Sequence, residues 1–343
     1  MRQHLTLLVK YLDRSEFEPL AIVAADDLLA MRLRALDVDV KVLSAVGAAN
    51  PLSVCETAVA VRKIAREQNI SLIHSHGYRA ALGAGLGAIA SGVPHVTTIH
   101  TEIGANKDIG IAGKAAQIAA GGLSRRVIAV SKRIADSFAP HKVRLVSNGV
   151  EIRPLKSRDR IPGKIIGVAA RLSPEKGVDL FIEAASMIAE MERDARFVII
   201  GEGPLRGELE ARAKELGLDG RLAFKGFVNN VEEELRSIDV LVIPSRSEGQ
   251  PMVLLEAMAA GCPVVAADVG GVADVLSGGC GTMVPPNDPA AIARAVLRIL
   301  SSPEEALRIA EAGRKRAEEA YSVERMVEET MNIYREVLEE ASV

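Results

Sequence analysis

Short apolar runs alternate with segments of helical period along almost the whole chain. Runs of four or five Val, Ile, Leu and Ala residues are typical of strands that are buried on both faces, and the segments between them are long enough for crossover helices. This alternation restricts the chain to an α/β fold built on parallel sheets. Aromatic residues make up only 3% of the chain, so aliphatic side chains must fill the interior.

The pattern predicts twelve strands, six in each half of the chain. They lie at 20–24, 40–43, 72–74, 96–99, 127–130 and 143–146 in the first half, and at 165–169, 197–200, 222–225, 240–243, 264–267 and 281–284 in the second. Because 343 residues exceed what one hydrophobic core usually organises, we expect two domains, each with a sheet of about six strands.

Four segments follow from this reading. The N-terminal domain spans 1–150, and a linker spans 151–164, where two prolines and several charges interrupt the periodicity. The second domain spans 165–320. A C-terminal helix at 321–343 is expected to pack back on the N-terminal domain.

The charge is unevenly distributed. Residues 1–150 hold 18 Lys and Arg against 12 Asp and Glu, whereas the remainder holds 24 against 33. A net charge of -3 argues against general nucleic-acid binding. The basic half is suited to peripheral contact with the inner face of a membrane or with a phosphate-bearing acceptor. An ordinary solvated surface is the alternative.

The compartment is indicated by cysteines and by hydropathy. Three widely spaced cysteines suggest neither a disulfide framework nor a zinc site, which favours a reducing cytoplasm. No apolar run approaches 18 residues and no secretion signal is recognisable at the start. We therefore expect a cytoplasmic protein, soluble or peripheral at a membrane.

Three loops that follow predicted strands contain residues suited to ligand binding or catalysis. In the first, Arg171 and Lys176 precede a predicted helix, whose N-terminal amides and dipole favour an anion. Two cations at that place would hold a diphosphate. In the second, Gly201 and Gly203 allow close approach of the backbone to a ligand, or simply form a tight turn.

The third loop carries two carboxylates. Glu248 lies in the loop after the strand at 240–243, and Glu256 lies within a helix that is expected to begin at Pro251. Glu256 could accept hydrogen bonds from two neighbouring hydroxyl groups. The backbone between them would face a sugar or phosphate, with N–H groups from every residue except the proline; these residues are Gly249, Gln250, Pro251, Met252 and Val253.

No convincing metal site is predicted. All six histidines lie in the first half, and His74 and His76 share one face of a strand, but no Asp or Glu pattern completes a ligand set. Asp37 and Asp39 have the spacing of a metal-binding pair, yet they lead directly into a strand. A polar turn is therefore the favoured interpretation. We expect neither a metal nor a cofactor.

These motifs together resemble glycosyltransferase family 4 of the GT-B fold. The resemblance rests on RLSPEKG at 171–177, VIIGEGP at 198–204, the loop from Ser245 to Glu256 and GCPVVAADVGG at 261–271, with VSNGV at 146–150 and TIHTE at 98–102 upstream. It covers nearly the whole chain. It implies two Rossmann-like domains facing a cleft, with the acceptor bound mainly by the N-terminal domain and the donor by the C-terminal one.

The resemblance also implies roles for single residues. Arg171 and Lys176 match the positions that bind the donor diphosphate, and Glu256 matches the one that binds the ribose. Glu248 corresponds to the Glu near the transferred sugar, and His100 to a histidine contributed by the N-terminal domain. We therefore take His100, Glu248, Arg171 and Lys176 as the catalytic set.

The start of the chain departs from the family pattern. Family members open with a strand and a Gly-Gly turn, whereas residues 1–20 here read as the first helix. We expect a truncated N-terminal domain without its first inner strand, which would leave backbone groups of its neighbours unpaired. Gly271-Val-Ala-Asp274 is a smaller departure, because the family more often has Pro and Glu at the last two positions.

The functional expectation is a retaining, metal-independent glycosyltransferase that uses a nucleotide diphosphate sugar and a glycan, lipid or small-molecule acceptor. Two alternatives remain open, namely a truncated, non-catalytic nucleotide-sugar-binding protein and a sugar-nucleotide epimerase. The sequence does not name the sugar, the nucleobase or the acceptor.

Overall fold

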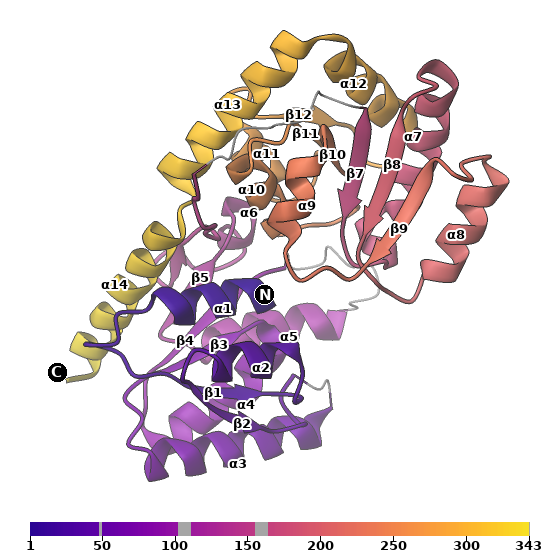
Figure 1. Ribbon diagram of the computed structural model, residues 1–343. Helices are drawn as coiled ribbons and strands as arrows, with labels where there is room; N and C mark the ends of the chain where they lie inside the picture. The colour runs from indigo at the N-terminus through magenta and orange to yellow at the C-terminus, as the bar shows by residue number, and fades with distance from the viewer. Residues whose placement is uncertain (48–49, 102–110, 155–163, 343) are drawn as a thin grey trace. The chain divides into compact units, whose positions relative to one another are not determined.

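A computed structural model describes the chain except for residues 48–49, 102–110, 155–163 and 343. Most of the expected linker and Glu102 therefore lie outside the described residues. The rest forms two compact units (Figure 1). Unit 1 comprises Met1–Gly149 and Val323–Val343, and unit 2 comprises Val150–Ser322.

A strand occurs at each of the twelve predicted positions, with ends within two residues of the prediction. Unit 1 contains β1 (Leu20–Val23), β2 (Asp39–Val42), β3 (Ile73–His76), β4 (His95–Ile99), β5 (Arg126–Ala129) and β6 (Val143–Leu145). Unit 2 contains β7 (Ile165–Ala169), β8 (Arg196–Ile200), β9 (Leu222–Gly226), β10 (Val240–Ile243), β11 (Val264–Ala267) and β12 (Thr282–Val284).

Helices connect these strands. In unit 1 they are α1 (Arg2–Tyr11), α2 (Leu28–Arg34), α3 (Pro51–Glu67), α4 (Tyr78–Ser91), α5 (Ile111–Gly122), α6 (Lys132–Ala135) and α14 (Val323–Ser342). In unit 2 they are the 3-10 turn η1 (Pro174–Lys176), α7 (Val178–Met191), α8 (Arg206–Glu215), α9 (Val231–Ser237), α10 (Met252–Ala259), α11 (Val272–Leu276), α12 (Pro289–Ser301) and α13 (Pro303–Ala320). None of the helices within the described ranges has the length and apolarity needed to cross a bilayer.

Unit 2 is a doubly wound domain. Its parallel sheet has the order β12-β11-β10-β7-β8-β9, and helices cover both faces. Alternate residues of one strand point into opposite cores: Val240 and Val242 pack with α7 and α12, whereas Leu241 and Ile243 pack with α9 and α10. This two-sided burial explains why the strand sequences are apolar without interruption.

The strand order of unit 2 changes direction between β7 and β10. The chain moves outward from β7 to β8 and β9, then returns to the other side of β7 with β10 and continues to β11 and β12. Such a switch point separates the two loops that leave the carboxyl ends of the central strands, and open α/β sheets bind their ligands there.

Unit 1 differs from the expectation of one six-stranded sheet. Its parallel strands form two sheets, β1-β2 and β3-β4-β5-β6, because β1 pairs only with β2 and β3 only with β4 among the described residues. Helices α1 and α2 cover the small sheet through Val9, Leu29 and Leu33. The interruption leaves one backbone edge of β1 and one of β3 without a described strand partner.

The last helix, α14, belongs to unit 1 although it is the end of the chain. The Tyr334 hydroxyl lies 2.5 Å from Nδ1 of His74 on β3. Arg126 and Arg144, on β5 and β6, both form ion pairs with Glu336. These contacts bind α14 to the four-stranded sheet.

Candidate active site

Four loops lie side by side at the carboxyl edge of the unit 2 sheet. The loop after β8 is joined to the loop after β7 by the Leu172 amide, which donates to the Glu202 carbonyl at 3.0 Å. The loop after β10 is joined to the β7 loop by the Arg246 amide, which donates to the Glu175 carbonyl at 2.8 Å. The Gly271 amide donates to the Gly249 carbonyl and adds the loop after β11. Backbone hydrogen bonds thus fix the predicted motifs next to one another.

Lys176 and Glu248 meet at the switch point. Lys176 Nζ donates to Glu248 Oε1 at 2.7 Å, and the Ser245 hydroxyl donates to the same oxygen at 2.7 Å. The Glu248 side chain is only 9% exposed and that of Lys176 is 27% exposed, so the carboxylate is largely shielded from bulk water. Two residues that are 72 positions apart and were singled out separately in the sequence are in direct contact.

Arg246 is a residue that the sequence reasoning missed. Its Nη1 and Nη2 donate to the two carboxylate oxygens of Asp179, at 2.8 and 2.6 Å, and Nη1 also donates to the Pro174 carbonyl at 2.8 Å. This bidentate contact fastens the β10 loop to the start of α7. No local pattern signals it, because the two partners are 67 residues apart.

Asp179 lies in the first turn of α7, the helix that follows Lys176 and that the sequence suggested as an anion site. Burial alone would raise the pKa of Asp179, but Arg246 and the amides of Asp179 and Leu180 outweigh it, and the pKa is lowered. The N-terminus of α7 therefore already faces a carboxylate. By contrast, α10 has no acidic residue in its first turn, and within the described chain no side chain caps it. The helix end better suited to an external anion is that of α10.

The residues around the start of α10 are largely buried. Glu256 and Gln250 are each 7% exposed, and Gly249 and Pro251 are also buried. Pro251 has an extended ψ of 125° and is the N-cap, so the helix begins at Met252, one residue later than predicted. Met252 and Val253 form its first turn and are partly exposed.

Arg171 stands apart from this set. It is exposed in the loop between β7 and η1, and no hydrogen-bond or ion-pair partner of its side chain occurs among the residues that the structure describes. The charge of Arg171 acts on the neighbouring Glu175. Burial would raise the pKa of Glu175, but the Ser173 hydroxyl, Lys176 and Arg171 lower that pKa below its usual value. Arg171 is available to an anion without first breaking a contact.

Gly201 and Gly203 have a packing role. Gly201 has φ +132°, and a Cβ there would lie 1.9 Å from the Ala170 carbonyl oxygen. A Cβ on Gly203 would lie 2.3 Å from the Leu172 oxygen. The space next to both glycines is filled by the backbone of the β7 loop, so their small size is required before any ligand binds.

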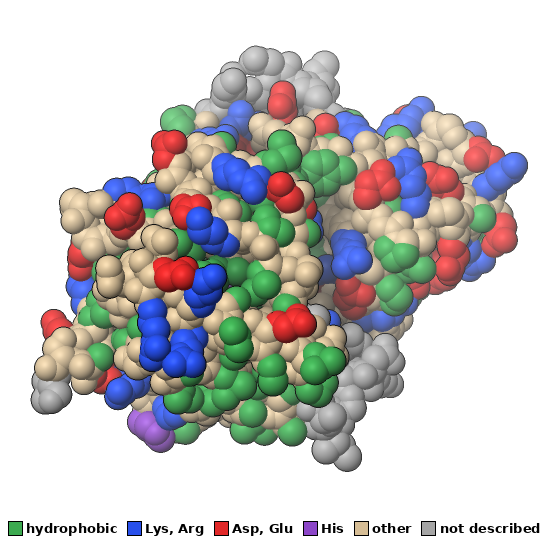
Figure 2. Space-filling view, turned by 90° about the horizontal axis from the view of Figure 1, so that it is seen from below, with side chains coloured by type: hydrophobic (Ala, Val, Ile, Leu, Met, Phe, Trp, Pro, Cys, Tyr) green, Lys and Arg blue, Asp and Glu red, His purple; other side chains and the backbone are tan. Residues whose placement is uncertain are grey.

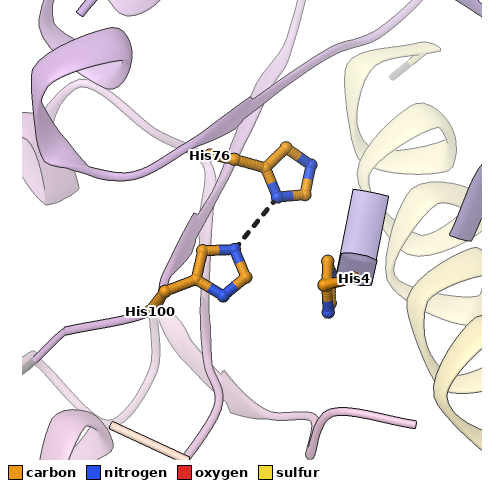
Figure 3. Close-up of side chains that lie close together, drawn as sticks. All are labelled: His4, His76 and His100. Carbon is orange, nitrogen blue, oxygen red and sulfur yellow. Dashed lines mark hydrogen bonds between the residues drawn. The ribbon is translucent and has the colours of Figure 1, made fainter. Parts of the chain in front are cut away.

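The histidine cluster of unit 1 is the second feature that the sequence reasoning did not anticipate. His76 at the end of β3 and His100 after β4 lie with Nδ1 and Nε2 3.2 Å apart (Figure 3). His4 on α1 lies beside them and is 1% exposed, and one nitrogen from each of the three rings lies within 4.8 Å of the others. The same-face prediction for His74 and His76 is confirmed by ring centroids 4.2 Å apart.

Burial holds these imidazoles neutral. It lowers the pKa of His4 to about 4 and that of His74 to about 3, and it brings the pKa of His76 and His100 well below the usual value. For His4, the N-terminal ammonium group lowers the pKa further, and the hydrogen bond to Asn148 only partly compensates. At neutral pH the cluster therefore offers uncharged nitrogen lone pairs.

Comparison with known families accounts for both units. Residues 1–153 match "Glycosyltransferase Family 4", and residues 156–316 match "Glycosyl transferases group 1".

Individual relatives are consistent with these matches. An uncharacterized glycosyltransferase of Methanocaldococcus jannaschii is 30% identical over 80% of this chain and 78% of the relative. The 2-deoxystreptamine glucosyltransferase of Streptomyces kanamyceticus is 33% identical over 63% of this chain and 56% of the relative. The chain spans about half the length of this and other relatives that it matches.

The fold also matches solved structures. The crystal structure of Anabaena Alr3699/HepE in complex with UDP-glucose superposes with a TM-score of 0.84 at 20% identity, covering 98% of this chain and 95% of that one. Sucrose-phosphate synthase from Thermosynechococcus elongatus gives a TM-score of 0.76 at 19% identity, with 94% and 100% covered.

Proposed function

The chain belongs to the GT-B glycosyltransferases of family 4 and group 1, and on this premise we propose that it moves a sugar from a nucleotide diphosphate sugar to a glycan, lipid or small-molecule acceptor, with retention of the anomeric configuration. The predicted family and the predicted α/β GT-B fold are confirmed. The donor, the acceptor and the stereochemistry are the proposed part.

The proposal is carried by the pair Lys176 and Glu248 at the switch point of unit 2. A cation and a carboxylate held 2.7 Å apart, with low exposure, at the carboxyl ends of β7 and β10 form a built site rather than two surface charges. Without ligand the two charges neutralise one another. A donor diphosphate would take over Lys176, and a sugar hydroxyl would take over Glu248, so neither group would be left unpaired.

The remaining donor contacts follow from the surrounding loops. We assign the diphosphate to Arg171, Lys176 and the first amides of α10, because α7 is already occupied by Asp179. Glu256 is assigned to the ribose and Glu248 to the transferred sugar. The supporting positions are Gly201, Gly203, Gly249, Gln250, Pro251, Met252 and Val253, and His100 of unit 1 is assigned to the sugar being transferred.

The chemistry is electrostatic. As the bond from the anomeric carbon to the diphosphate breaks, negative charge grows on the leaving phosphate, and Arg171, Lys176 and the α10 amides stabilise it. The acceptor hydroxyl attacks from the leaving-group side, and its proton passes to the departing phosphate oxygen. Because two cations neutralise the diphosphate, the transfer is proposed to need no metal ion.

Substitution of Glu256 and substitution of Glu248 are expected to change different quantities, the first the affinity for the nucleotide and the second the turnover rate. Glu256→Gln should raise the dissociation constant of the nucleoside diphosphate about 10- to 100-fold, because it loses a charge-assisted hydrogen bond worth about 1.5–3 kcal/mol. Glu248→Gln should not raise that constant, because it frees Lys176 for the diphosphate, and it should lower kcat, because the contact of Glu248 is to the reacting sugar. Calorimetric titration and steady-state rates on both variants measure the two effects.

A matched control is Glu208→Gln on the exposed start of α8, which should change neither quantity. If Glu248→Gln and Glu256→Gln altered only the melting temperature, both carboxylates would be structural and the donor assignment would fail.

Contact with an anionic membrane is a separate proposal for unit 1. The exposed face of α3 carries Val59 beside Arg62 and Lys63, and α4 adds Ile89. Figure 2 views the molecule from the α3 side of Figure 1 and shows Lys and Arg side chains next to hydrophobic ones. Apolar and basic groups together are what an anionic lipid surface attracts. The exposed thiol of Cys55 favours the reducing cytoplasmic side.

Vesicle sedimentation tests this surface. The protein should bind vesicles that contain phosphatidylglycerol and not vesicles of phosphatidylcholine alone. Arg62→Gln with Lys63→Gln should weaken binding roughly 30-fold, at about 1 kcal/mol for each charge removed. Lys214→Gln with Lys315→Gln in unit 2 serves as the control of equal charge. Equal binding to both kinds of vesicle, or equal losses in both variants, would leave an ordinary solvated surface.

A further inference from the structure

We propose that His4, His76 and His100 form a binding site for a zinc ion in unit 1. The three rings come from three separate elements, α1, the end of β3 and the segment after β4, and the fold brings one nitrogen of each within 4.8 Å of the others (Figure 3). Nothing in the proposed sugar transfer uses such a group of three.

The spacing suits a tetrahedral ion. Zinc binds histidine nitrogen at about 2.0–2.1 Å, which places two ligands of a tetrahedron about 3.3 Å apart. His76 Nδ1 and His100 Nε2 are already 3.2 Å apart, so one edge of the tetrahedron has the required length, and both rings have to turn until their lone pairs point at the ion instead of along the hydrogen bond. The ring of His4, whose ligand nitrogen lies within 4.8 Å of the other two, has to approach further by rotation about its side-chain bonds.

Each of the three histidines can present a nitrogen lone pair to the ion without releasing a proton to solvent. His4 Nδ1 lies 2.9 Å from Asn148 Oδ1, an acceptor that holds the proton on Nδ1 and leaves Nε2 with its lone pair. A backbone or side-chain oxygen in this position is the usual orienting partner of a metal-bound histidine. The proton that His76 and His100 share moves to the other nitrogen of its own ring, so binding needs no net proton release.

His74 supports the cluster and is not a ligand. Its Nδ1 lies 2.5 Å from the Tyr334 hydroxyl and its Nε2 lies 2.7 Å from the Thr98 hydroxyl, so both nitrogens are occupied. Its ring packs against His76 and restricts how far that ring can turn. Among the described residues the site therefore has three ligands, which leaves the fourth position of a tetrahedron for water.

The choice of metal follows from the ligands. The group contains only histidine within the described part of the chain, with no carboxylate. Imidazole nitrogen suits zinc and its transition-metal neighbours, whereas magnesium, calcium and manganese prefer oxygen. The site should therefore discriminate strongly against magnesium.

The ion would regulate transfer rather than catalyse it. On the proposed function, His100 contacts the sugar being transferred, and a His100 that ligates zinc is withdrawn from that contact. Zinc should then abolish transfer, and EDTA should restore it, while transfer in EDTA alone stays at its full rate. This consequence rests on the proposed function, whereas the binding site itself does not.

The test is direct titration of the purified full chain with zinc in competition with a chromophoric chelator, without any sugar donor. One equivalent should bind, and a large excess of magnesium should not displace it. His4→Gln, His76→Gln and His100→Gln should each weaken binding at least about 100-fold, and Asn148→Ala about tenfold or more. The exposed His141→Gln and Cys55→Ser should bind as the wild type does.

A spectroscopic readout covers variants that fold poorly. Cobalt in place of zinc should give the visible absorption of a tetrahedral nitrogen site in the wild type and lose it in His76→Gln and His100→Gln, both of which alter partly exposed rings. The melting temperature without metal shows whether each variant is folded. Zinc affinity that is unchanged in folded variants of all three histidines, or that is lost with Cys55→Ser, overturns the site.

Discussion

Lys176→Ala is expected to lower kcat/KM about 100- to 1,000-fold, the usual consequence of removing a group that stabilises developing charge. Lys176 is the cation that the structure holds at the switch point, 2.7 Å from Glu248. Steady-state release of nucleoside diphosphate from the donor measures the effect. Lys176→Arg keeps the charge but not the compact ammonium group, so it should retain an intermediate rate.

The same substitution has a structural effect that must be separated from catalysis. Removing Lys176 leaves the shielded Glu248 carboxylate with the Ser245 hydroxyl but without its ion pair, which should lower the melting temperature. Lys176→Ala combined with Glu248→Gln should recover stability and stay inactive. Lys214→Ala on the exposed face of α8 is the control and should behave as the wild type. A Lys176→Ala rate within twofold of the wild type would contradict the role of this lysine.

Gly201→Ala is expected to destabilise unit 2 by about 2–6 kcal/mol. The new Cβ would stand 1.9 Å from the Ala170 carbonyl oxygen, and φ +132° is a conformation that side chains rarely adopt. Backbone strain of about 1–3 kcal/mol and overpacking of similar size add to this range. Urea unfolding of the ligand-free protein, followed by a probe in unit 2, measures it.

Gly207→Ala in α8 is the matched control. A Cβ at Gly207 meets nothing within 4 Å, so alanine should stabilise the helix by about 0.4–1 kcal/mol. If Gly201→Ala kept the stability of the wild type and lost only affinity for the donor, Gly201 would serve the ligand and not the packing of the β7 and β8 loops.

The sequence predicts the strands well because their signal is local. Buried strands such as β10 and β11 are uninterrupted apolar runs, and glycines or prolines bound them, so their positions follow from residue type alone. The positions of the loops that follow these strands are predicted equally well, because the strand ends define them. For the same reason, Lys176 and Glu248 could be singled out before their contact was known.

What the sequence does not predict depends on long-range contacts. Arg246 and Asp179 are 67 residues apart, and their contact determines that α10, not α7, has the open helix end. His4, His76 and His100 come from α1, the end of β3 and the segment after β4, and only the fold brings them together. The division of the unit 1 strands into two sheets also depends on which strand edges meet, and residue type does not encode this.

We propose that the loops after β7 and β10 hold the diphosphate of a nucleotide-sugar donor. Calorimetric titration with UDP, GDP and ADP, on the wild type and on Arg171→Ala with Lys176→Ala, tests it most directly. At least one of these diphosphates should bind the wild type in a one-to-one complex. The double variant should lose at least about 1.5–3 kcal/mol of that binding, at least about tenfold in affinity, while remaining folded. Binding of equal strength to both proteins, or no binding of any of the three to the wild type, would contradict it.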